Sequence, residues 1–336
     1  MVKFINFFKV YELNHVPNSC QRLQYPFSRS MIHAFTEMAK ALGFVAAGFT
    51  RTGRPIHMDV YLRWVKAGKQ GDMSWMGRNL DIREDPTKLL PGCRTVVSLA
   101  WPYPKEKPAT PDGLTASRYT RPDALDYHVE LKEKCRSLAD GLCRQFPGER
   151  TRICVDSAPI LERSFAQMSG IGFIGKNNLL IVPGYGSYIY LAEILTTADL
   201  PASEAQTPKD PCGDCTRCLD ACPTGALEAP YSLNASKCLS YLTIEWKGDV
   251  DEETGKRMGD CFIGCDRCQE ACPHNNGGLS SRRVVLPMAR EFMDMDADTF
   301  ERRFGRTALA RPGLAKIQSN LKAICKNQGT KTRGRG

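Results

Sequence analysis

The chain has 336 residues, of which 42% are hydrophobic and 25% charged, and it carries a formal net charge of +9. That composition is ordinary for a globular protein with room for two or three domains, and no apolar run reaches the roughly 18 residues of a membrane span. The charge suits a phosphate-rich partner but fits a basic protein without one equally well. Residues 1–30 lack the small-residue cleavage site of a signal peptide and are expected to be a non-essential extension.

Apolar spacing predicts three helices and a buried strand in the first half of the chain. One helical face recurs from Met31 to Leu42, a second helix covers about 57–67, and a long helix runs from Tyr127 to Phe146. Between them, Thr95–Trp101 is an almost continuous apolar run that ends at prolines, which is typical of a buried strand.

Shorter elements are predicted further along the chain. A strand at 152–155 leads into Asp156, and a helix is expected over 159–168, with its proline in the first turn. Strands at 179–182 and 187–196 are expected to pair with each other across a Pro-Gly turn. A proline-containing linker then leads to a cysteine-rich region.

The most specific feature of the sequence is a CxxCxxCxxxCP run. It comprises Cys212, Cys215, Cys218 and Cys222, followed by Pro223. Thiolates at this spacing hold a cubic 4Fe–4S cluster, and the fourth usually belongs to a second cluster. The pattern recurs imperfectly at Cys265, Cys268 and Cys272, followed by Pro273. Zinc knuckles also use CxxC pairs, but zinc has no need for the CxxxCP ending. Two 4Fe–4S clusters and a reducing cytoplasm are therefore predicted.

The second cysteine set lacks one ligand, because residue 262 is Phe where a two-cluster ferredoxin has Cys. Cys238 and Cys261 are the two candidates to replace it. Using Cys238 closes a long loop, which costs little additional entropy. The preferred assignment gives one cluster Cys212, Cys215, Cys218 and Cys272, and gives the other Cys222, Cys238, Cys265 and Cys268. Cys261 stays open as the alternative ligand.

A glycine-rich stretch at 170–176 imitates two nucleotide-binding motifs. It matches GxGxxG and, with Lys176, the beginning of a P-loop. A dinucleotide motif must follow a strand and open a helix, whereas here a helix precedes and a strand follows. A P-loop also needs Ser or Thr after the lysine, and residue 177 is Asn. The glycines are instead expected to let the backbone approach a large flat cofactor.

Several segments, in the same order, resemble the epoxyqueuosine reductases. They are GDMSWMGRNLDIREDPTKLLPGCRTVVSLA, SRYTRPDALDYH, VDSAPILERSFAQMSGIGFIGKNNLLI, CGDCTRCLDACPTGAL, KCLSYLTIEWKG and GCDRCQEACPHN. The resemblance covers roughly residues 31–280 and also favours Cys238 as a ligand. It implies the last step of queuosine biosynthesis, in which epoxyqueuosine in tRNA is reduced to queuosine. Cobalamin and electrons relayed by two 4Fe–4S clusters from a low-potential donor are implied for this step.

By the same resemblance, Asp156 is the proton donor for the epoxide oxygen, and it also contacts the cofactor. Its pKa would then have to be raised by burial, because an ordinary aspartate is ionised at neutral pH. A helix-capping role ahead of the helix at 159–168 is the structural alternative. His128 could be proposed as a cobalt ligand, but a structural role is favoured because cobalt has no protein ligand in this family.

The resemblance also assigns further residues to the site. The cofactor-binding candidates are Arg78, Tyr119, Lys176, Asn177, Ser240 and Tyr241. Arg163 is the candidate tRNA contact. For each of these residues a salt bridge or a buried polar role is the alternative.

The expected fold is α+β, with a cobalamin-binding domain at 31–200, a ferredoxin-like domain at 201–280 and a short helical, basic tail at 281–336. The stretch 306–336 is expected to hold one amphipathic helix and then a disordered basic end, so the contribution of the tail to tRNA binding is an open question. A monomer without a membrane partner is expected. Two other functions are alternatives. One is a reductive dehalogenase-like enzyme acting on a small molecule, which would be expected to carry a twin-arginine signal. The other is an electron carrier.

Overall fold

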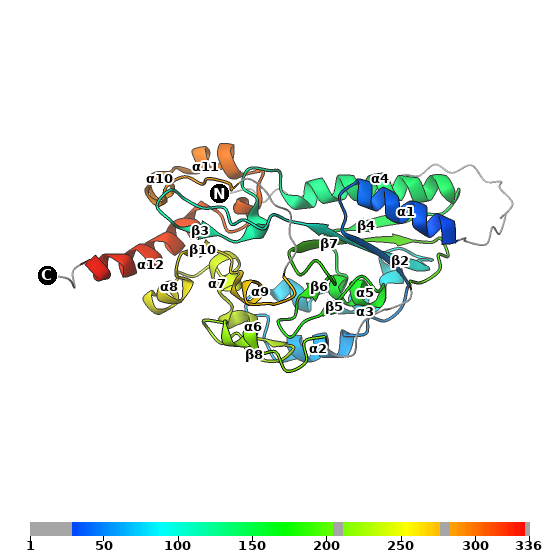
Figure 1. Cartoon of the computed structure of the whole chain (residues 1–336), viewed down its shortest axis with the longest axis horizontal. Coiled ribbons are helices and arrows are strands. Elements are labelled where there is room, and N and C mark those ends of the chain that lie inside the picture. The colour runs from blue at the N-terminus through cyan, green and yellow to red at the C-terminus, as the bar shows by residue number, and fades with distance from the viewer. Residues whose placement is uncertain (1–28, 204–210, 276–282, 333–336) are drawn as a thin grey trace.

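The structure is a computed structural model that describes residues 29–203, 211–275 and 283–332. Its larger half is built on an antiparallel sheet with strand order β1-β2-β7-β4 (Figure 1). The strands are β1 (Ala46–Arg51), β2 (Thr95–Pro102), β4 (Thr151–Cys154) and β7 (Ile189–Thr196). Helices α1 (Arg29–Ala41) and α4 (Tyr127–Gln145) cover one face of this sheet, and α5 (Glu162–Met168) covers the other.

Strand β2 is buried along its whole length because both faces of the sheet are covered. Val97, Leu99 and Trp101 pack with α1 and α4. Val96 and Ala100 point the other way, into the clusters that hold α5. Alternate residues of a strand face opposite sides, so the apolar run that predicted this strand reflects two separate cores.

The predicted helices over Met31–Leu42, 57–67 and Tyr127–Phe146 are confirmed as α1, α2 (Met58–Lys66) and α4, and the strand predictions for β2 and β4 are confirmed too. The helix predicted from residue 159 begins later, as α5, with Leu161 at its N-cap. Pro159 therefore lies in the loop that follows Asp156.

The predicted pairing of the strands at 179–182 and 187–196 is wrong. Strand β6 (Leu180–Ile181) pairs with β5 (Phe173–Ile174), while β7 pairs with β2 and β4. A single bridge between Val182 and Gly186 is all that joins the two segments. The central sheet offers β7 eight-residue pairing with a buried strand, which outweighs a local hairpin.

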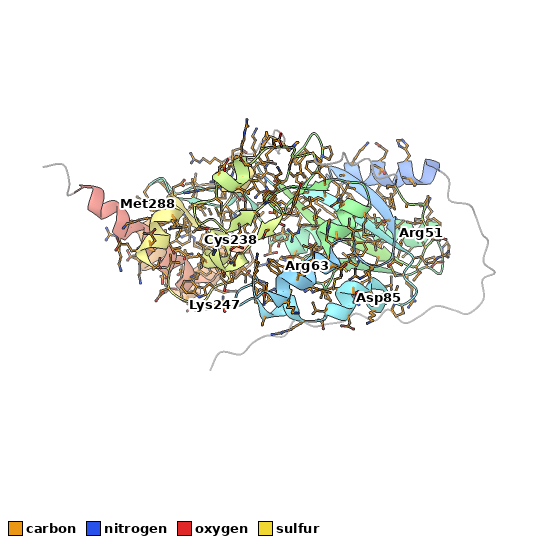
Figure 2. The ribbon with its side chains drawn as sticks, turned by 90° about the horizontal axis from the view of Figure 1, so that it is seen from below. Arg51, Arg63, Asp85, Cys238, Lys247 and Met288 are labelled. Carbon is orange, nitrogen blue, oxygen red and sulfur yellow. The ribbon has the colours of Figure 1, made fainter. Side chains whose placement is uncertain are left out.

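The cysteine-rich segments and the C-terminal helices form the other half of the molecule (Figures 1 and 2). Helices α6 to α9 of this half run over Arg217–Asp220, Leu239–Ile244, Glu252–Met258 and Arg267–Glu270. The short helix α3 (Leu80–Glu84) lies near α5 instead. The C-terminal helices are α10 (Ala289–Asp294), α11 (Ala297–Phe304) and α12 (Leu314–Thr332). The helix predicted within 306–336 is α12, while α10 and α11 precede that stretch and had no predicted bounds. Their buried side chains share a core with Phe262, Ile263 and Met258, so this segment is packed rather than loosely attached.

The two halves are joined by backbone pairing. Strand β3 (Thr115–Ala116), from the long loop after β2, pairs in parallel with β10 (Cys261–Ile263). Figure 2 places Cys238 between Met288, in the C-terminal half, and Arg51, at the far end of the sheet. The remaining hairpin, β8 (Leu227–Ala229) with β9 (Ser232–Leu233), follows the first cysteine run. Among the described residues, no helix is both long enough and apolar enough to span a bilayer.

The loop after α2 is fixed by a close approach that only glycine permits. Gly71 has φ +60°, and a Cβ there would lie 2.8 Å from the ring of Tyr241 in α7. The Tyr241 hydroxyl also accepts a hydrogen bond from the backbone N–H of Asp72 at 2.9 Å. Replacing Gly71 by Ala is therefore expected to lower the free energy of unfolding by about 1–3 kcal/mol, from backbone strain and the collision together.

Gly68 provides a matched control for this prediction. It has φ +67°, but a Cβ there would meet nothing within 4 Å. Gly68→Ala should therefore lose only about 1 kcal/mol, the cost of the left-handed backbone. Urea titrations of both variants, followed by tryptophan fluorescence, compare them. Equal losses would contradict a collision with Tyr241.

Candidate functional site

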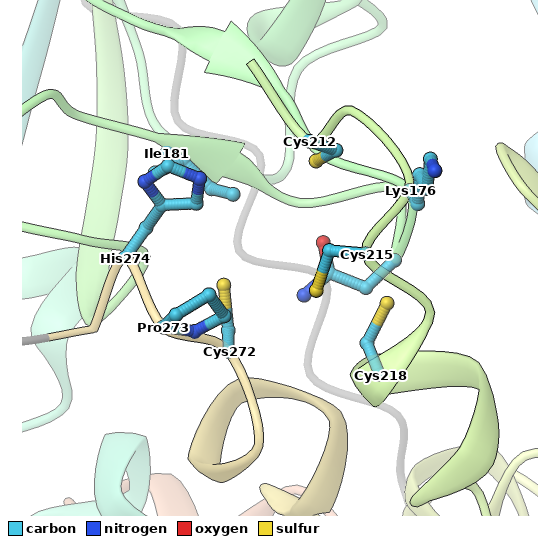
Figure 3. A pocket seen from close by; sticks show the side chains of 9 residues that line it. Lys176, Ile181, Cys212, Cys215, Cys218, Cys272, Pro273 and His274 are labelled. Carbon is cyan, nitrogen blue, oxygen red and sulfur yellow. The ribbon is translucent and has the colours of Figure 1, made fainter. Parts of the chain in front are cut away.

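Four cysteines of the first predicted set converge on one cavity (Figure 3). Cys212 and Cys215 come from the loop that leads into α6, Cys218 lies within α6, and Cys272 follows α9. The other residues that line the cavity are Lys176, Asn177, Ile181, Pro273 and His274. The fourth cysteine thus comes from the second run, as the crossed pattern of a two-cluster protein requires.

The second set gathers Cys222, Cys238, Cys265 and Cys268. Burial raises the pKa of the Cys268 thiol, and charge on the other three cysteines raises it further, so the four sulfurs are neighbours. Cys238 is the N-cap of α7, and the backbone N–H groups of Ser240 and Tyr241 interact with its sulfur. Such N–H contacts stabilise a thiolate and help to set the potential of a cluster.

Cys261 is near Cys265, whose charge contributes to the raised pKa of the Cys261 thiol, but its hydrogen bonds run to the backbone. Its thiol is buried in β10 and donates to the carbonyl oxygen of Ile263 at 3.2 Å. The next residue, Phe262, is completely buried in the core formed with α10 and α12. A strand that supplies a core phenylalanine at residue 262 cannot supply a thiolate there, which explains the missing cysteine. The geometry favours Cys238 over Cys261 as the replacement.

Within the described residues, no group of three or more His, Cys, Asp or Glu side chains is arranged to hold a single metal ion. The cysteines instead gather in larger groups, one of which lines a common cavity. Cysteine thiolates are the usual ligands of iron–sulfur clusters. The donor set, all cysteine and divided four and four, fits two iron–sulfur clusters.

Lys176 and Asn177 connect the two cysteine sets to the sheet half. The Lys176 ammonium donates to the carbonyl oxygen of Gly213, in the first run. The Asn177 amide donates to the carbonyl oxygen of Cys268, in the second run, at 3.4 Å. These residues lie in the turn between β5 and β6, so no helix follows the glycines and the nucleotide motifs are accidental, as predicted.

The expectation that the glycines of this stretch approach a cofactor stays a prediction, but Gly172 and Gly175 are also required by contacts within the protein. A Cβ on Gly172 would lie 2.4 Å from the carbonyl oxygen of Ile181, and one on Gly175 would lie 2.6 Å from the Ile181 side chain. Both glycines therefore allow β5 to pack closely against β6. They position Lys176 and Asn177 indirectly, by tightening the turn.

Asp156 lies in a strained turn directly after β4. Its φ is +54°, a left-handed value that a non-glycine residue adopts only at a cost. The carboxylate accepts hydrogen bonds from the Tyr127 hydroxyl at 2.7 Å and from Nε2 of His128 at 3.1 Å. Its backbone N–H donates to Oε1 of Glu162 at 2.6 Å. The capping alternative is wrong, because α5 begins further along and its N-cap, Leu161, has no side-chain cap.

His128 lies between two carboxylates. Its Nδ1 is 2.5 Å from Oδ1 of Asp126, and its Nε2 faces Asp156. Burial lowers the pKa of His128, but the two carboxylates outweigh burial and raise it to about 9. Burial raises the pKa of Asp156, but hydrogen bonds from His128 and Tyr127 outweigh burial and lower it. The rise in the Asp156 pKa that the resemblance implies depends on burial beneath the cofactor and stays a prediction, whereas the hydrogen bonds of the present arrangement favour the carboxylate.

Glu162 stabilises the turn by accepting the hydrogen bond from the backbone N–H of Asp156. Burial, together with the charge of Asp156, raises its pKa to about 8. An unfolded glutamate titrates near 4.3, so the folded chain holds an extra proton between these values and its stability falls as the pH rises through this window. Glu162→Gln is expected to reduce this fall. The test compares the melting temperatures of the wild-type protein and Glu162→Gln between pH 5 and 8. Glu133→Gln serves as the control, because Glu133 is exposed. If the melting temperature falls with pH equally in all three proteins, Glu162 is not the cause.

The remaining predicted residues are distributed around Asp156 and the cysteines. Tyr119 packs edge-on against Tyr127, and its carbonyl oxygen accepts from the Tyr190 hydroxyl at 2.5 Å. Arg78 is exposed and donates to the Ser74 hydroxyl at 3.1 Å. Arg163 is exposed and donates to the carbonyl oxygen of Asn178. Neither arginine has a described contact with Asp156.

The residues near Asp156 that the sequence reasoning missed include Tyr127, Asp126, Glu162 and Arg311. The first two are part of the DYH segment that carries the resemblance, so a signal for them was present. Arg311 comes from the C-terminal segment, and its guanidinium donates to both oxygens of Glu245. No motif connected that segment with Asp156.

Two cysteine sets together with a carboxylate–imidazole pair in the same chain are typical of an iron–sulfur oxidoreductase. Residues 211–275 match the family described as a 4Fe-4S double cluster binding domain, and residues 83–157 match the family described as Epoxyqueuosine reductase QueG, DUF1730. An epoxyqueuosine reductase from Leadbetterella byssophila is 36% identical over 77% of this chain and 86% of its own length. An epoxyqueuosine reductase from Pseudomonas aeruginosa is 35% identical over 75% of this chain and 71% of its own length.

Solved structures agree with the sequence relatives. The epoxyqueuosine reductase of Streptococcus thermophilus is 31% identical, with a TM-score of 0.80 over 89% of this chain and 82% of that one. A structure of an epoxyqueuosine reductase with an epoxyqueuosine-modified tRNA-Tyr stem loop is 30% identical, with a TM-score of 0.75. The match covers 88% of this chain and 80% of that one. The chain belongs to the epoxyqueuosine reductase family, as the order of its motifs predicted.

Proposed function

We propose that this protein reduces the epoxide of epoxyqueuosine in tRNA to give queuosine. Two electrons and two protons are consumed, the epoxide oxygen leaves as water, and an alkene remains. The observation that carries the proposal is the strained turn that presents Asp156 to His128, in a family whose relatives are named for this reaction. A solved relative that holds an epoxyqueuosine-modified tRNA stem loop supports the substrate.

The clusters provide the route for electrons from a low-potential donor. Eight thiolates, Cys212, Cys215, Cys218, Cys272, Cys222, Cys238, Cys265 and Cys268, hold them. Lys176 and Asn177 contact the backbone of both cysteine runs and lie where electrons would pass towards the sheet half. Because iron–sulfur clusters are kept reduced in a reducing compartment, the cytoplasm is the proposed location.

The chain's own groups hold and move the proton. An epoxide oxygen is a poor leaving group until it is protonated, so an acid must be in contact with it. Asp156 is the group that reaches outward, because its side chain is 58% exposed. His128, held by Asp126, carries the proton and is one hydrogen bond away. We propose that His128 protonates Asp156 as substrate binds, and that Asp156 passes this proton to the epoxide oxygen.

Cobalamin is the proposed second cofactor, and it would supply the low-potential metal centre that reduces the epoxide carbon. Arg78, Tyr119, Ser240 and Tyr241 are proposed to hold it, with Lys176 and Asn177 on the cluster side. Two segments of the proposed pocket contain buried polar atoms without a hydrogen-bond partner among the described residues, the Ser117 hydroxyl and the Asn178 amide nitrogen. The corrin ring of cobalamin carries amide side chains, which could form hydrogen bonds with these two unpaired polar atoms.

The decisive experiment is anaerobic. Cluster-reconstituted protein, cobalamin, a low-potential reductant and epoxyqueuosine-containing tRNA are mixed, and the nucleosides are identified by mass spectrometry. The expected product has lost one oxygen atom. If both clusters and cobalamin are present and the oxygen is retained, the reaction proposed here is wrong.

A further inference from the structure

Arg311 lies beside Asp156 although 155 positions separate them in the chain. It follows the turn Ala308–Ala310, η5, which is anchored by the fully buried Leu309. The Thr307 hydroxyl accepts a hydrogen bond from the backbone N–H of Leu309 at 3.2 Å and caps this turn. The charge of Arg311 is close enough to lower the pKa of Asp156. The C-terminal segment thus brings a fixed guanidinium to the site.

One edge of this guanidinium is occupied. Nε and Nη2 donate to the two oxygens of Glu245 at 3.0 and 3.1 Å, and Glu245 is held at the C-terminal end of α7. No other hydrogen bond of Arg311 is present among the residues that the structure describes, and its side chain is 58% exposed. A guanidinium carries five donors in a planar fork, so an edge remains for an outside acceptor.

The Arg311 guanidinium lies over the ring of Trp75. Cζ of Arg311 is 5.7 Å from the centre of the Trp75 ring, and Trp75 is 39% exposed. Trp75 belongs to the turn Ser74–Gly77, η1, directly before Arg78. Exposed aromatic rings beside arginines are the pairing that single-stranded nucleic acids use, with bases on the rings and phosphates on the arginines.

We propose that the unoccupied edge of Arg311 binds a phosphodiester beside Asp156, with Trp75 as the adjoining surface. The proposal rests on the proposed function, because a tRNA would bring such a group with the reacting nucleoside. The nucleotide loop of cobalamin carries the same chemical group, so the test separates the two sources.

RNA binding is measured with a fluorescent anticodon stem loop over a range of salt concentrations. Arg311→Gln is expected to weaken binding about 10-fold, the value of one charge-assisted hydrogen-bonded contact. Loss of one phosphate contact should also reduce the slope of log K against log salt by about 0.7. Arg311→Lys keeps the charge and should keep the slope. Arg290→Gln, on α10 and 91% exposed, is the matched control and should change neither quantity.

Cobalamin binding to the same variants is followed by absorbance titration with hydroxocobalamin. If Arg311→Gln weakens cobalamin binding and leaves the RNA slope unchanged, the phosphodiester is that of the cofactor. If it changes neither, or if Arg290→Gln has the same effect on RNA, the proposal is wrong. Both measurements are independent of turnover, so failure of the reductase assay would overturn the proposed reaction without deciding the role of Arg311.

Discussion

Replacing Asp156 by Asn is expected to lower kcat for epoxide reduction by about 10²–10⁴-fold, the usual contribution of a positioned acid. Asparagine keeps the size of the side chain and can still hydrogen-bond to Tyr127, but it cannot carry a proton from His128 to the substrate. Because Asp156 has no described contact with a cysteine, the visible spectrum of both clusters should be unchanged. Single-turnover assays with mass-spectrometric detection measure the loss.

Asp123→Asn is a suitable control, since Asp123 is exposed on the loop before the DYH segment and loses the same charge. It should retain nearly full activity. His128→Gln provides a second comparison, because it should slow the reaction by withholding the proton while leaving the Asp156 carboxyl in place. An Asp156→Asn protein with wild-type turnover would remove this residue from the mechanism.

Replacing Cys238 by Ser is expected to remove one of the two clusters, and Cys261→Ser is expected to retain both. The reason is geometric: the Cys238 sulfur lies with Cys222, Cys265 and Cys268, whereas the Cys261 thiol is bonded to the carbonyl oxygen of Ile263. Iron analysis after anaerobic reconstitution should therefore show about half the wild-type iron in Cys238→Ser. Turnover should be lost with it, because the electron path is broken.

The two serine variants act as controls for each other, since each removes one thiol from the same half of the molecule. Electron paramagnetic resonance of the reduced proteins distinguishes a one-cluster from a two-cluster signal. Full iron in Cys238→Ser together with half the iron in Cys261→Ser would reverse the assignment.

The sequence predicted most reliably where a pattern is local. The spacing of the cysteines predicted the set that the structure brings together around one cavity, but left Cys238 and Cys261 as alternatives in the other set. The apolar periodicity of α1, α2 and α4 located those helices to within a few residues. The pairing of β7 was missed because its partners, β2 and β4, are far away in the chain, and periodicity carries no information about distant partners. Pro159 suggested an early helix start, but the turn held by Asp156 and Glu162 occupies that position.

The pKa shifts of the site could not be predicted from the sequence either. A raised pKa for Asp156 followed from the idea of a buried acid, but the sign depends on His128 and Tyr127, which the fold alone brings to the carboxylate. Arg311 was missed for a similar reason: the packing of three C-terminal helices, which no motif indicated, carries it to the site.

The backbone pairing between the two halves limits how the molecule can move. Beside the β3–β10 pair, Ala109 exchanges backbone hydrogen bonds with Val284 and Leu286, and the backbone N–H of Asp126 donates to the carbonyl oxygen of Arg306. A hinge that opened the halves would have to break all of these bonds together. A bulky RNA therefore meets a rigid frame, and access to the acid depends on the short strained turn at Asp156 rather than on domain opening.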